Sequence, residues 1–109
     1  MRLMVLAILL VGTLPGAAPP WEKKKSHAGE ALYRENCVVC HDIDKPESKK
    51  LGPDFHQLFK REKMPMSNGK PSRAYIAVRI QFGGTLMPAF RTVLTKAQIE
   101  TLIDYIQSR

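Results

Sequence analysis

The chain has few of the residues that build a large hydrophobic core or cross-link a small one. Among its 109 residues only 7% are aromatic, and there are just two cysteines and one tryptophan. Leu, Ile and Val must therefore fill a core of limited size. Small domains bury a modest fraction of their surface and often depend on a disulfide, a metal or a cofactor for stability. We therefore expect such a cross-link in this fold.

Further absences narrow the classes of function. No apolar run reaches the ~20 residues that span a bilayer, so no stable membrane span is expected. The formal charge is +7, yet the sequence holds no nucleic-acid-binding motif, and nucleic acid is not an expected partner. No catalytic acid, base or nucleophile is assembled with a partner group, so the protein is not predicted to be an enzyme. The basic charge is then either a solvated surface or a means of attracting an acidic partner.

The first residues have the pattern of a secretory signal. Arg2 precedes an apolar run that ends at Leu14, and small residues follow, as in signal peptides. We predict a cleaved signal peptide (1–18), a tether (19–25) and one domain (26–109). A retained anchor is the alternative. The predicted location is the periplasm or another extracytoplasmic compartment, where two cysteines would normally suggest a disulfide.

The spacing of the cysteines favours a different use. Cys37, Cys40 and His41 form a C-x-x-C-H motif, and residues three and four apart share one face of a helix. Two thiols can therefore reach two vinyl groups of one porphyrin while the imidazole supplies an axial nitrogen, as in covalent haem c attachment. A redox-active C-x-x-C pair and half of a zinc site are the alternatives. The first would need a βαβ surround and the second more ligands at close spacing, and neither pattern is visible.

A second axial ligand would distinguish electron transfer from ligand chemistry. Met87 is the candidate, because Gly83 and Gly84 end the preceding helix and allow close approach to a flat ring, while Pro88 fixes the adjoining backbone. A thioether is a soft ligand that favours ferrous iron. The other interpretation of a lone methionine is a core filler. Four other side chains could in principle reach an iron: Met64, Met66, His27 and His56.

With these motifs in this order, the sequence resembles the class I (cytochrome c-like) monohaem cytochromes over about residues 26–108. The matching pieces are Gly29, Tyr33, the motif at 37–41, the Leu-Gly-Pro loop at 51–53, the Met-Pro loop at 87–90 and the last helix at 94–106. The resemblance implies an all-α cytochrome c fold. About four short helices would wrap around one covalently bound haem c, and the first and last helices would cross.

The resemblance also implies contacts for individual residues. The Pro53 carbonyl would accept a hydrogen bond from the His41 ring. Mitochondrial-type members often have a Gly-Arg pair after this loop, with the arginine near a haem propionate. Here the pair is Lys60-Arg61, so Arg61 is a candidate propionate contact. Arg79 is a second candidate, although a solvated arginine is the commoner arrangement.

Helical periodicity and capping residues predict where the helices lie. The predicted elements are a helix from Ser26 to about residue 36, a short one after residues 52–54, one capped by Ser72 that runs to about 82, and one opened by a Thr95–Gln98 capping box. The last helix carries an apolar stripe formed by Ile99, Leu102, Ile103 and Ile106. By resemblance, it crosses the first helix at Gly29, with Tyr105 near the crossing.

These features together predict an extracytoplasmic electron-transfer protein whose iron cycles between ferric and ferrous with His41 and Met87 bound. Alternatives are a cytochrome subunit permanently docked to a dehydrogenase or oxidase complex, and a haem sensor or enzyme with a labile sixth ligand. Redox proteins with an acidic docking face are the expected partners. The segment from Lys45 to Arg73 holds eight basic residues against three acidic ones.

Overall fold

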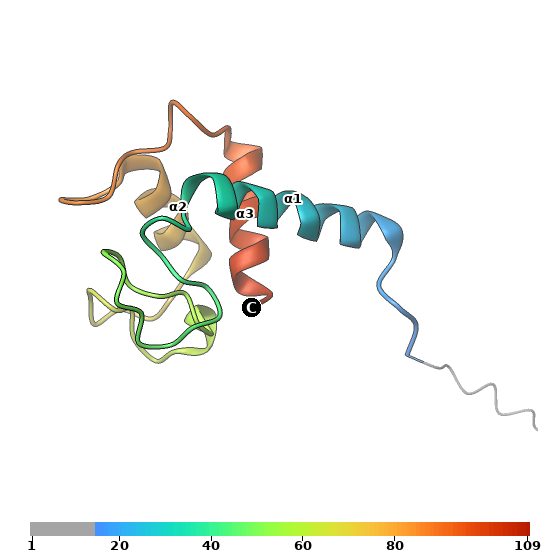
Figure 1. Ribbon diagram of the computed structural model, residues 1–109, viewed down its shortest axis with the longest axis horizontal. Helices are drawn as coiled ribbons and strands as arrows, with labels where there is room; N and C mark the ends of the chain where they lie inside the picture. The colour runs from blue at the N-terminus through green and yellow to red at the C-terminus, as the bar shows by residue number, and fades with distance from the viewer. Residues whose placement is uncertain (1–14) are drawn as a thin grey trace, which may run out of the picture.

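The computed structural model describes residues 15–109, and these form an all-helical arrangement without strands (Figure 1). The elements are α1 (Pro20–Asn36), the 3-10 turn η1 (Leu58–Lys60), α2 (Arg73–Phe82) and α3 (Lys96–Gln107). The predicted all-α fold with about four short elements is confirmed. Most of the predicted signal peptide lies outside the described residues. Within residues 15–109, no helix combines the length and apolar character needed to cross a membrane.

The first helix begins earlier than the sequence pattern indicated. Pro19 is the N-cap in an extended conformation and Pro20 is the first helical residue, a position that suits proline because its fixed φ matches the helix and no N–H is needed there. The predicted start at Ser26 is therefore wrong, and residues 20–25 are helical. Figure 1 shows this part of α1 projecting beyond the rest of the domain. The division into signal peptide, tether and domain remains a prediction.

Helices α1 and α3 cross in close contact at Gly29, as the resemblance implied. A Cβ atom at Gly29 would lie 2.5 Å from Cβ of Tyr105 and 2.8 Å from the carbonyl oxygen of Thr101. Only glycine allows the two backbones to approach so closely. One turn further along α1, the Tyr33 ring packs against Tyr105 with ring centroids 6.0 Å apart. The crossing therefore sets how the end of α1 lies on α3.

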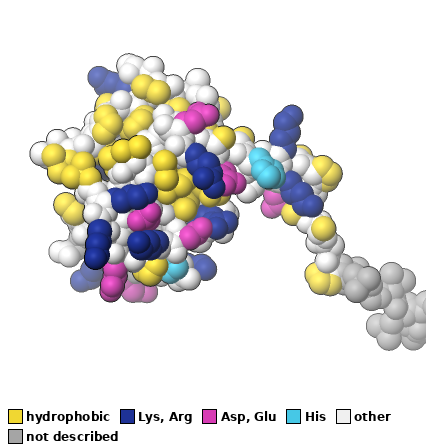
Figure 2. Space-filling model, viewed as in Figure 1, with side chains coloured by type: hydrophobic (Ala, Val, Ile, Leu, Met, Phe, Trp, Pro, Cys, Tyr) yellow, Lys and Arg dark blue, Asp and Glu magenta, His cyan; other side chains and the backbone are white. Residues whose placement is uncertain are grey.

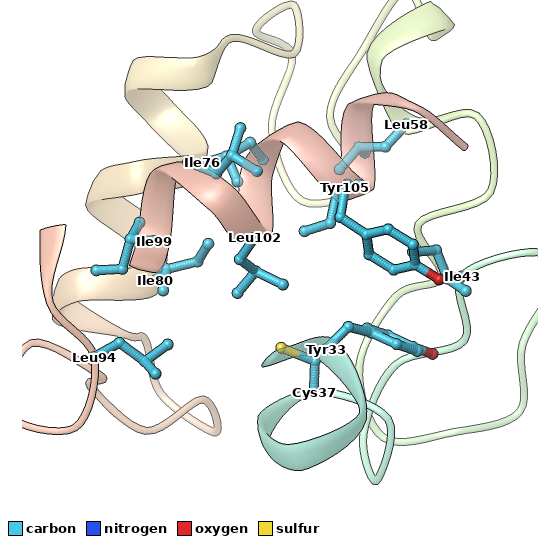
Figure 3. Close-up of a cluster of buried hydrophobic side chains, with 12 residues drawn as sticks. Tyr33, Cys37, Ile43, Leu58, Ile76, Ile80, Leu94, Ile99, Leu102 and Tyr105 are labelled. Carbon is cyan, nitrogen blue, oxygen red and sulfur yellow. The ribbon is translucent and has the colours of Figure 1, made fainter. Parts of the chain in front are cut away.

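Helix α3 is the centre of the hydrophobic core. Its predicted apolar stripe is confirmed, because the most deeply buried side chains of the domain are Ile99, Leu102, Ile103 and Ile106. Figure 3 shows side chains of α1 and α2 gathered around α3. The predicted capping box opens α3: the Thr95 hydroxyl accepts from the Gln98 N–H at 3.1 Å, and the Gln98 side chain accepts from the Thr95 N–H at 2.8 Å. Both contacts satisfy donors that a helix start leaves unpaired.

Helix α2 is bounded by the residues that the sequence indicated. The Ser72 hydroxyl accepts a hydrogen bond from the Tyr75 N–H at 3.1 Å. The helix ends at Gly83, whose φ of 68° lies in the left-handed region that glycine adopts without strain. Ile76 and Ile80 are its buried residues. The helix is thus fixed at both ends, and the segment carrying Met87 leaves from its C-terminus.

The segment between the first two helices is mostly irregular. The loop at 42–50 contains one buried side chain, Ile43. The short helix expected after residue 54 is the single turn η1, with Leu58 buried and Phe55 and Phe59 partly buried against the core. Hydrogen bonds and a few apolar side chains, rather than regular structure, therefore hold this half of the molecule.

We expect Gly29→Ala to destabilise the protein by about 1–3 kcal/mol, the usual cost of overpacking a close contact. In a helix interior alanine is more stable than glycine by ~0.5–1 kcal/mol, but here the added methyl group would collide with α3. Urea unfolding monitored by circular dichroism measures the difference. Gly69→Ala is the control, because a Cβ atom there would meet only the Ser67 hydroxyl at 3.6 Å. Equal midpoints for Gly29→Ala and the wild type would contradict the close crossing.

Candidate haem-attachment site

The C-x-x-C-H motif forms a compact turn at the C-terminus of α1. The Cys37 N–H donates to the Tyr33 carbonyl at 2.8 Å, and the Cys37 carbonyl accepts from the N–H groups of Cys40 at 3.1 Å and His41 at 2.9 Å. Both cysteines are free thiols. Cys37 is buried among core residues of α1, α2 and α3 (Figure 3), whereas Cys40 is half-buried. The turn therefore offers two unpaired sulfurs beside one imidazole.

The environment of Cys37 does not suit a redox-active thiolate. Burial, followed by the neighbouring Cys40, raises the pKa of Cys37 to about 11. Reactive C-x-x-C cysteines need a lowered pKa, because the thiolate is the nucleophile. Among residues 15–109, moreover, no three His, Cys, Asp or Glu side chains gather as a metal site. The geometry thus favours haem attachment over the redox-pair and zinc alternatives.

The imidazole of His41 is held in one orientation by the Gly-Pro loop. Its Nδ1 lies 2.6 Å from the Pro53 carbonyl oxygen, the contact that the resemblance implied. A carbonyl can only accept, so Nδ1 carries the hydrogen and Nε2 keeps its lone pair. Such a second contact fixes the tautomer and raises the basicity of a metal-binding histidine. Burial, the largest influence, lowers the pKa of His41 below its usual value, which favours the neutral form in which an imidazole can bind a metal.

Two neighbours pack directly against this imidazole. The Phe55 ring stacks on it with centroids 4.4 Å apart and planes inclined by 22°. A Cβ atom at Gly52 would come within 2.3–2.8 Å of three ring atoms, so the Gly52 backbone lies against the ring and no larger residue fits. The Tyr33 hydroxyl also donates to the His41 carbonyl at 2.7 Å. Ring and backbone of His41 are therefore both restrained.

The donor set and its supports fit a covalently attached haem c. Two thiols and one oriented imidazole lie on a single turn, and the turn is tied to the following loop because the Gly52 N–H donates to the Cys40 carbonyl at 2.8 Å. Sequence reasoning found the thiols, the imidazole and Pro53. The stacking of Phe55 on His41 was not predicted, since the spacing of fourteen residues through an irregular loop carries no periodic signal.

The Met87 segment folds back on the end of α2. The Gly84 N–H donates to the Met87 carbonyl at 2.9 Å, and a Cβ atom at Gly83 would lie 2.3 Å from that same carbonyl oxygen. Further along, the Phe90 N–H donates to the Ile80 carbonyl at 3.0 Å. Met87 is partly buried against the core. The predicted end of the helix at Gly83 is confirmed, and the two glycines form a tight turn with the Met87 backbone; their approach to a flat ring stays a prediction.

The four other candidate ligands differ in how deeply their side chains are buried. Met66 is 82% exposed and His27 is exposed on α1. His56 is half-buried, and its backbone N–H donates to the Asp54 carboxylate. Met64, however, is partly buried against the same core as Met87. Burial thus sets Met66 and His27 apart from Met87, but not Met64 or His56.

The two candidate propionate contacts have protein partners of their own. The Arg61 guanidinium donates to the Asp54 carboxylate at 2.5 Å and to the His56 carbonyl at 2.7 Å. Arg79 donates to the Tyr75 hydroxyl at 2.9 Å and to the Gly83 carbonyl at 3.2 Å. Arg61 therefore braces the loop before η1, and Arg79 braces the end of α2.

Comparisons with known proteins agree with this geometry. A family model described as "Cytochrome C oxidase, cbb3-type, subunit III" matches residues 24–106. A cytochrome c of Gossypium barbadense is 33% identical over 66 residues, which are 61% of this chain and 57% of that protein. A cytochrome c of Ginkgo biloba is 40% identical over 45 residues, or 41% of this chain and 37% of that protein.

The chain spans between about a third and three fifths of the length of these curated relatives. The family match, by contrast, covers most of the chain and includes the attachment turn, the Gly-Pro loop and the Met87 segment. The chain belongs to this family of class I c-type cytochromes, which carry one covalently bound haem c.

Proposed function

We propose that the protein is an extracytoplasmic electron carrier in which Cys37 and Cys40 attach one haem c and His41 and Met87 are the axial ligands. The hydrogen bond between His41 Nδ1 and the Pro53 carbonyl is the observation that carries the proposal. It leaves Nε2 as a fixed, neutral donor beside two free thiols. When bound, the haem would supply an iron that exchanges one electron between its ferric and ferrous states.

The surrounding residues would serve mainly to hold the two axial ligands in place while the iron changes its oxidation state. Pro53, Phe55 and Gly52 restrain the imidazole, and the Gly83–Gly84 turn restrains the segment of Met87. Ligands that stay in place in both oxidation states keep the structural cost of electron transfer low. With His41 and Met87 both bound, no open position would be left for a substrate, which is consistent with a carrier rather than an enzyme.

Met87 is proposed over Met64 because its segment is a closed turn anchored to the end of a core helix. Gly83 adopts a φ of 68°, and the turn at 83–88 is closed by the hydrogen bond from Gly84 to the Met87 carbonyl. Met64 has a turn of its own, in which its N–H donates to the Gly69 carbonyl at 2.8 Å, but that segment does not continue from a core helix. A thioether ligand raises the reduction potential of the iron relative to a second histidine.

The compartment is proposed from the N-terminal sequence. Residues 1–18 have the arrangement of a secretory signal, and thiols of exported chains meet an oxidising environment. Attachment of both sulfurs to one porphyrin would protect them from forming a disulfide there. The proposed site is therefore the periplasm or an equivalent compartment.

The docking face is proposed to be basic, although some of its candidate basic residues are paired with carboxylates of the chain. Three of the eight basic residues between 45 and 73 are engaged: Lys50 with Asp42, Arg61 with Asp54, and Arg73 with Glu100 and Asp104. The other five make no ion pair within residues 15–109: Lys45, Lys49, Lys60, Lys63 and Lys70. Figure 2 shows basic and acidic side chains intermingled on the lower half of one face. The proposed acidic partner would therefore meet these five lysines.

A second candidate function is that of a cytochrome subunit in a larger complex. The matching family is described as a subunit of a cytochrome c oxidase, and Figure 2 shows hydrophobic groups gathered on the upper left of the domain. Exposed apolar patches mark interaction surfaces. Gel filtration of the holoprotein and its co-purifying proteins would distinguish a free carrier from a subunit.

Covalent attachment predicts that extraction with acidified acetone leaves the haem colour with the protein. The double variant Cys37→Ala/Cys40→Ala should yield no coloured protein, because neither thioether can form, while the single variant Cys40→Ala should keep one attachment. The absorbance of the protein and solvent fractions is the measurement. Free haem in the solvent from the wild-type protein would contradict the assignment.

Ligation by Met87 predicts a sulfur–iron charge-transfer band at long wavelength in the ferric spectrum. Met87→Ala should abolish the band, whereas Met64→Ala is the matched control and should retain it. Met87→His should also lower the midpoint potential, since imidazole stabilises ferric iron more than a thioether does. Loss of the band in Met64→Ala alone would assign the ligand to Met64.

A basic docking face predicts that electron transfer to an acidic redox partner slows as salt rises, because exposed charges are screened beyond ~8 Å at physiological ionic strength. Lys49→Glu combined with Lys63→Glu should slow association on the order of tenfold at low salt. Lys50 is unsuitable for this test, since it is paired with Asp42. Lys23→Glu, on the projecting start of α1, is the control. Stopped-flow rates independent of salt would reject the model.

A further inference from the structure

An ion pair closes the attachment turn from outside. The Lys50 ammonium lies 3.0 Å from the Asp42 carboxylate and donates to the Val38 carbonyl at 2.5 Å. Val38 follows the first cysteine of the motif and Asp42 follows its histidine. Lys50 therefore connects the two ends of the turn that carries both thiols and the imidazole.

The carboxylate of this pair is held by a second contact. The Ser48 hydroxyl donates to Asp42 at 2.6 Å and also accepts from the Lys50 N–H at 3.1 Å. The Asp42 carboxylate therefore has a hydroxyl donor on one oxygen and the Lys50 ammonium on the other. The pair thus places one positive and one negative charge at fixed positions beside His41.

This pair is more protected from solvent than the pair that Asp44 of the same loop makes with Arg109 near the C-terminus. The Lys50 and Asp42 side chains are 32% and 21% exposed, whereas those of Arg109 and Asp44 are 42% and 56% exposed. Exposed ion pairs are strongly screened by water and salt, and partly buried ones less so. A charge left unpaired at position 42 or 50 would therefore act on the site more strongly than one at position 44.

We propose that the Asp42–Lys50 pair is a charge-balanced clasp on the attachment turn, and that its balance sets the reduction potential of the haem. The inference rests on the proposed function, because it takes His41 as the iron ligand. Asp42 and Lys50 are positioning residues in this role, since they act through the turn and through their charges rather than by touching the iron.

A charge-balanced pair predicts the direction in which each single substitution shifts the reduction potential. An unpaired negative charge near the iron stabilises the ferric state and lowers the potential, while an unpaired positive charge raises it. Lys50→Met leaves Asp42 unpaired, and Asp42→Asn leaves Lys50 unpaired. A clasp that only held the turn in place would behave differently, because both variants would loosen the site, admit water and lower the potential.

The experiment is a double-mutant cycle on the holoprotein, with midpoint potentials measured by spectroelectrochemistry. Lys50→Met should shift the reduction equilibrium toward ferric by up to tenfold, and Asp42→Asn toward ferrous by a similar factor, where tenfold corresponds to about 59 mV for a one-electron couple. The double variant should return close to the wild-type potential. Asp44→Asn is the matched control and should shift the potential less than Asp42→Asn does.

Potentials that fall in both single variants, or change in neither, would overturn the proposal. If Lys50→Met yields no holoprotein, Asp42→Asn alone decides, with a rise supporting the proposal and a fall or no change rejecting it. The wild-type ferric spectrum and the acid–acetone extraction report separately on ligation and attachment. Failure of the proposed function would therefore appear in the wild-type protein, and failure of the clasp only in the variants.

Discussion

The contact between α1 and α3 at Gly29 determines where the attachment turn lies. Gly29, Tyr33 and Cys37 follow one another at intervals of four residues, and all three are buried. They therefore form one face of α1, and the crossing at Gly29 directs the whole face toward α3. Cys37 is placed among the core side chains for this reason. The position of the loop at 42–57 then depends on the turn, because the loop is hydrogen-bonded to Cys40, His41 and Asp42.

The site is rigid although little regular structure surrounds it. Between α1 and α2 the only helical element is η1, and the chain is held by contacts such as the stacking of Phe55 on His41 and the Arg61–Asp54 pair. Each contact alone is modest in energy. Because they converge on one imidazole and one loop, a displacement of His41 would break several of them together.

The parts predictable from sequence were those with short-range signals. Ser72 and the Thr95–Gln98 box act within three residues, and the apolar stripe of α3 repeats at helical spacing. The start of α1 was misplaced because Ser26 is a good cap, while Pro20 in the first helical position carried an equally valid signal six residues earlier. The burial of Met64 and the Lys50–Val38 contact depend on how an irregular loop folds over the turn. No periodicity in the sequence encodes such contacts.

The burial of Cys37 also has a consequence for the order in which the protein matures. The core that covers this thiol is built around α3, which is the last helix of the described chain. A polypeptide emerges from its N-terminus, so α1 and its two thiols are present before the residues that bury them. Until α3 is present, the core that buries Cys37 is incomplete and its thiol is more open to reagents. The fold thus leaves an interval during synthesis in which the Cys37 thiol is accessible, and the packing of α3 ends it.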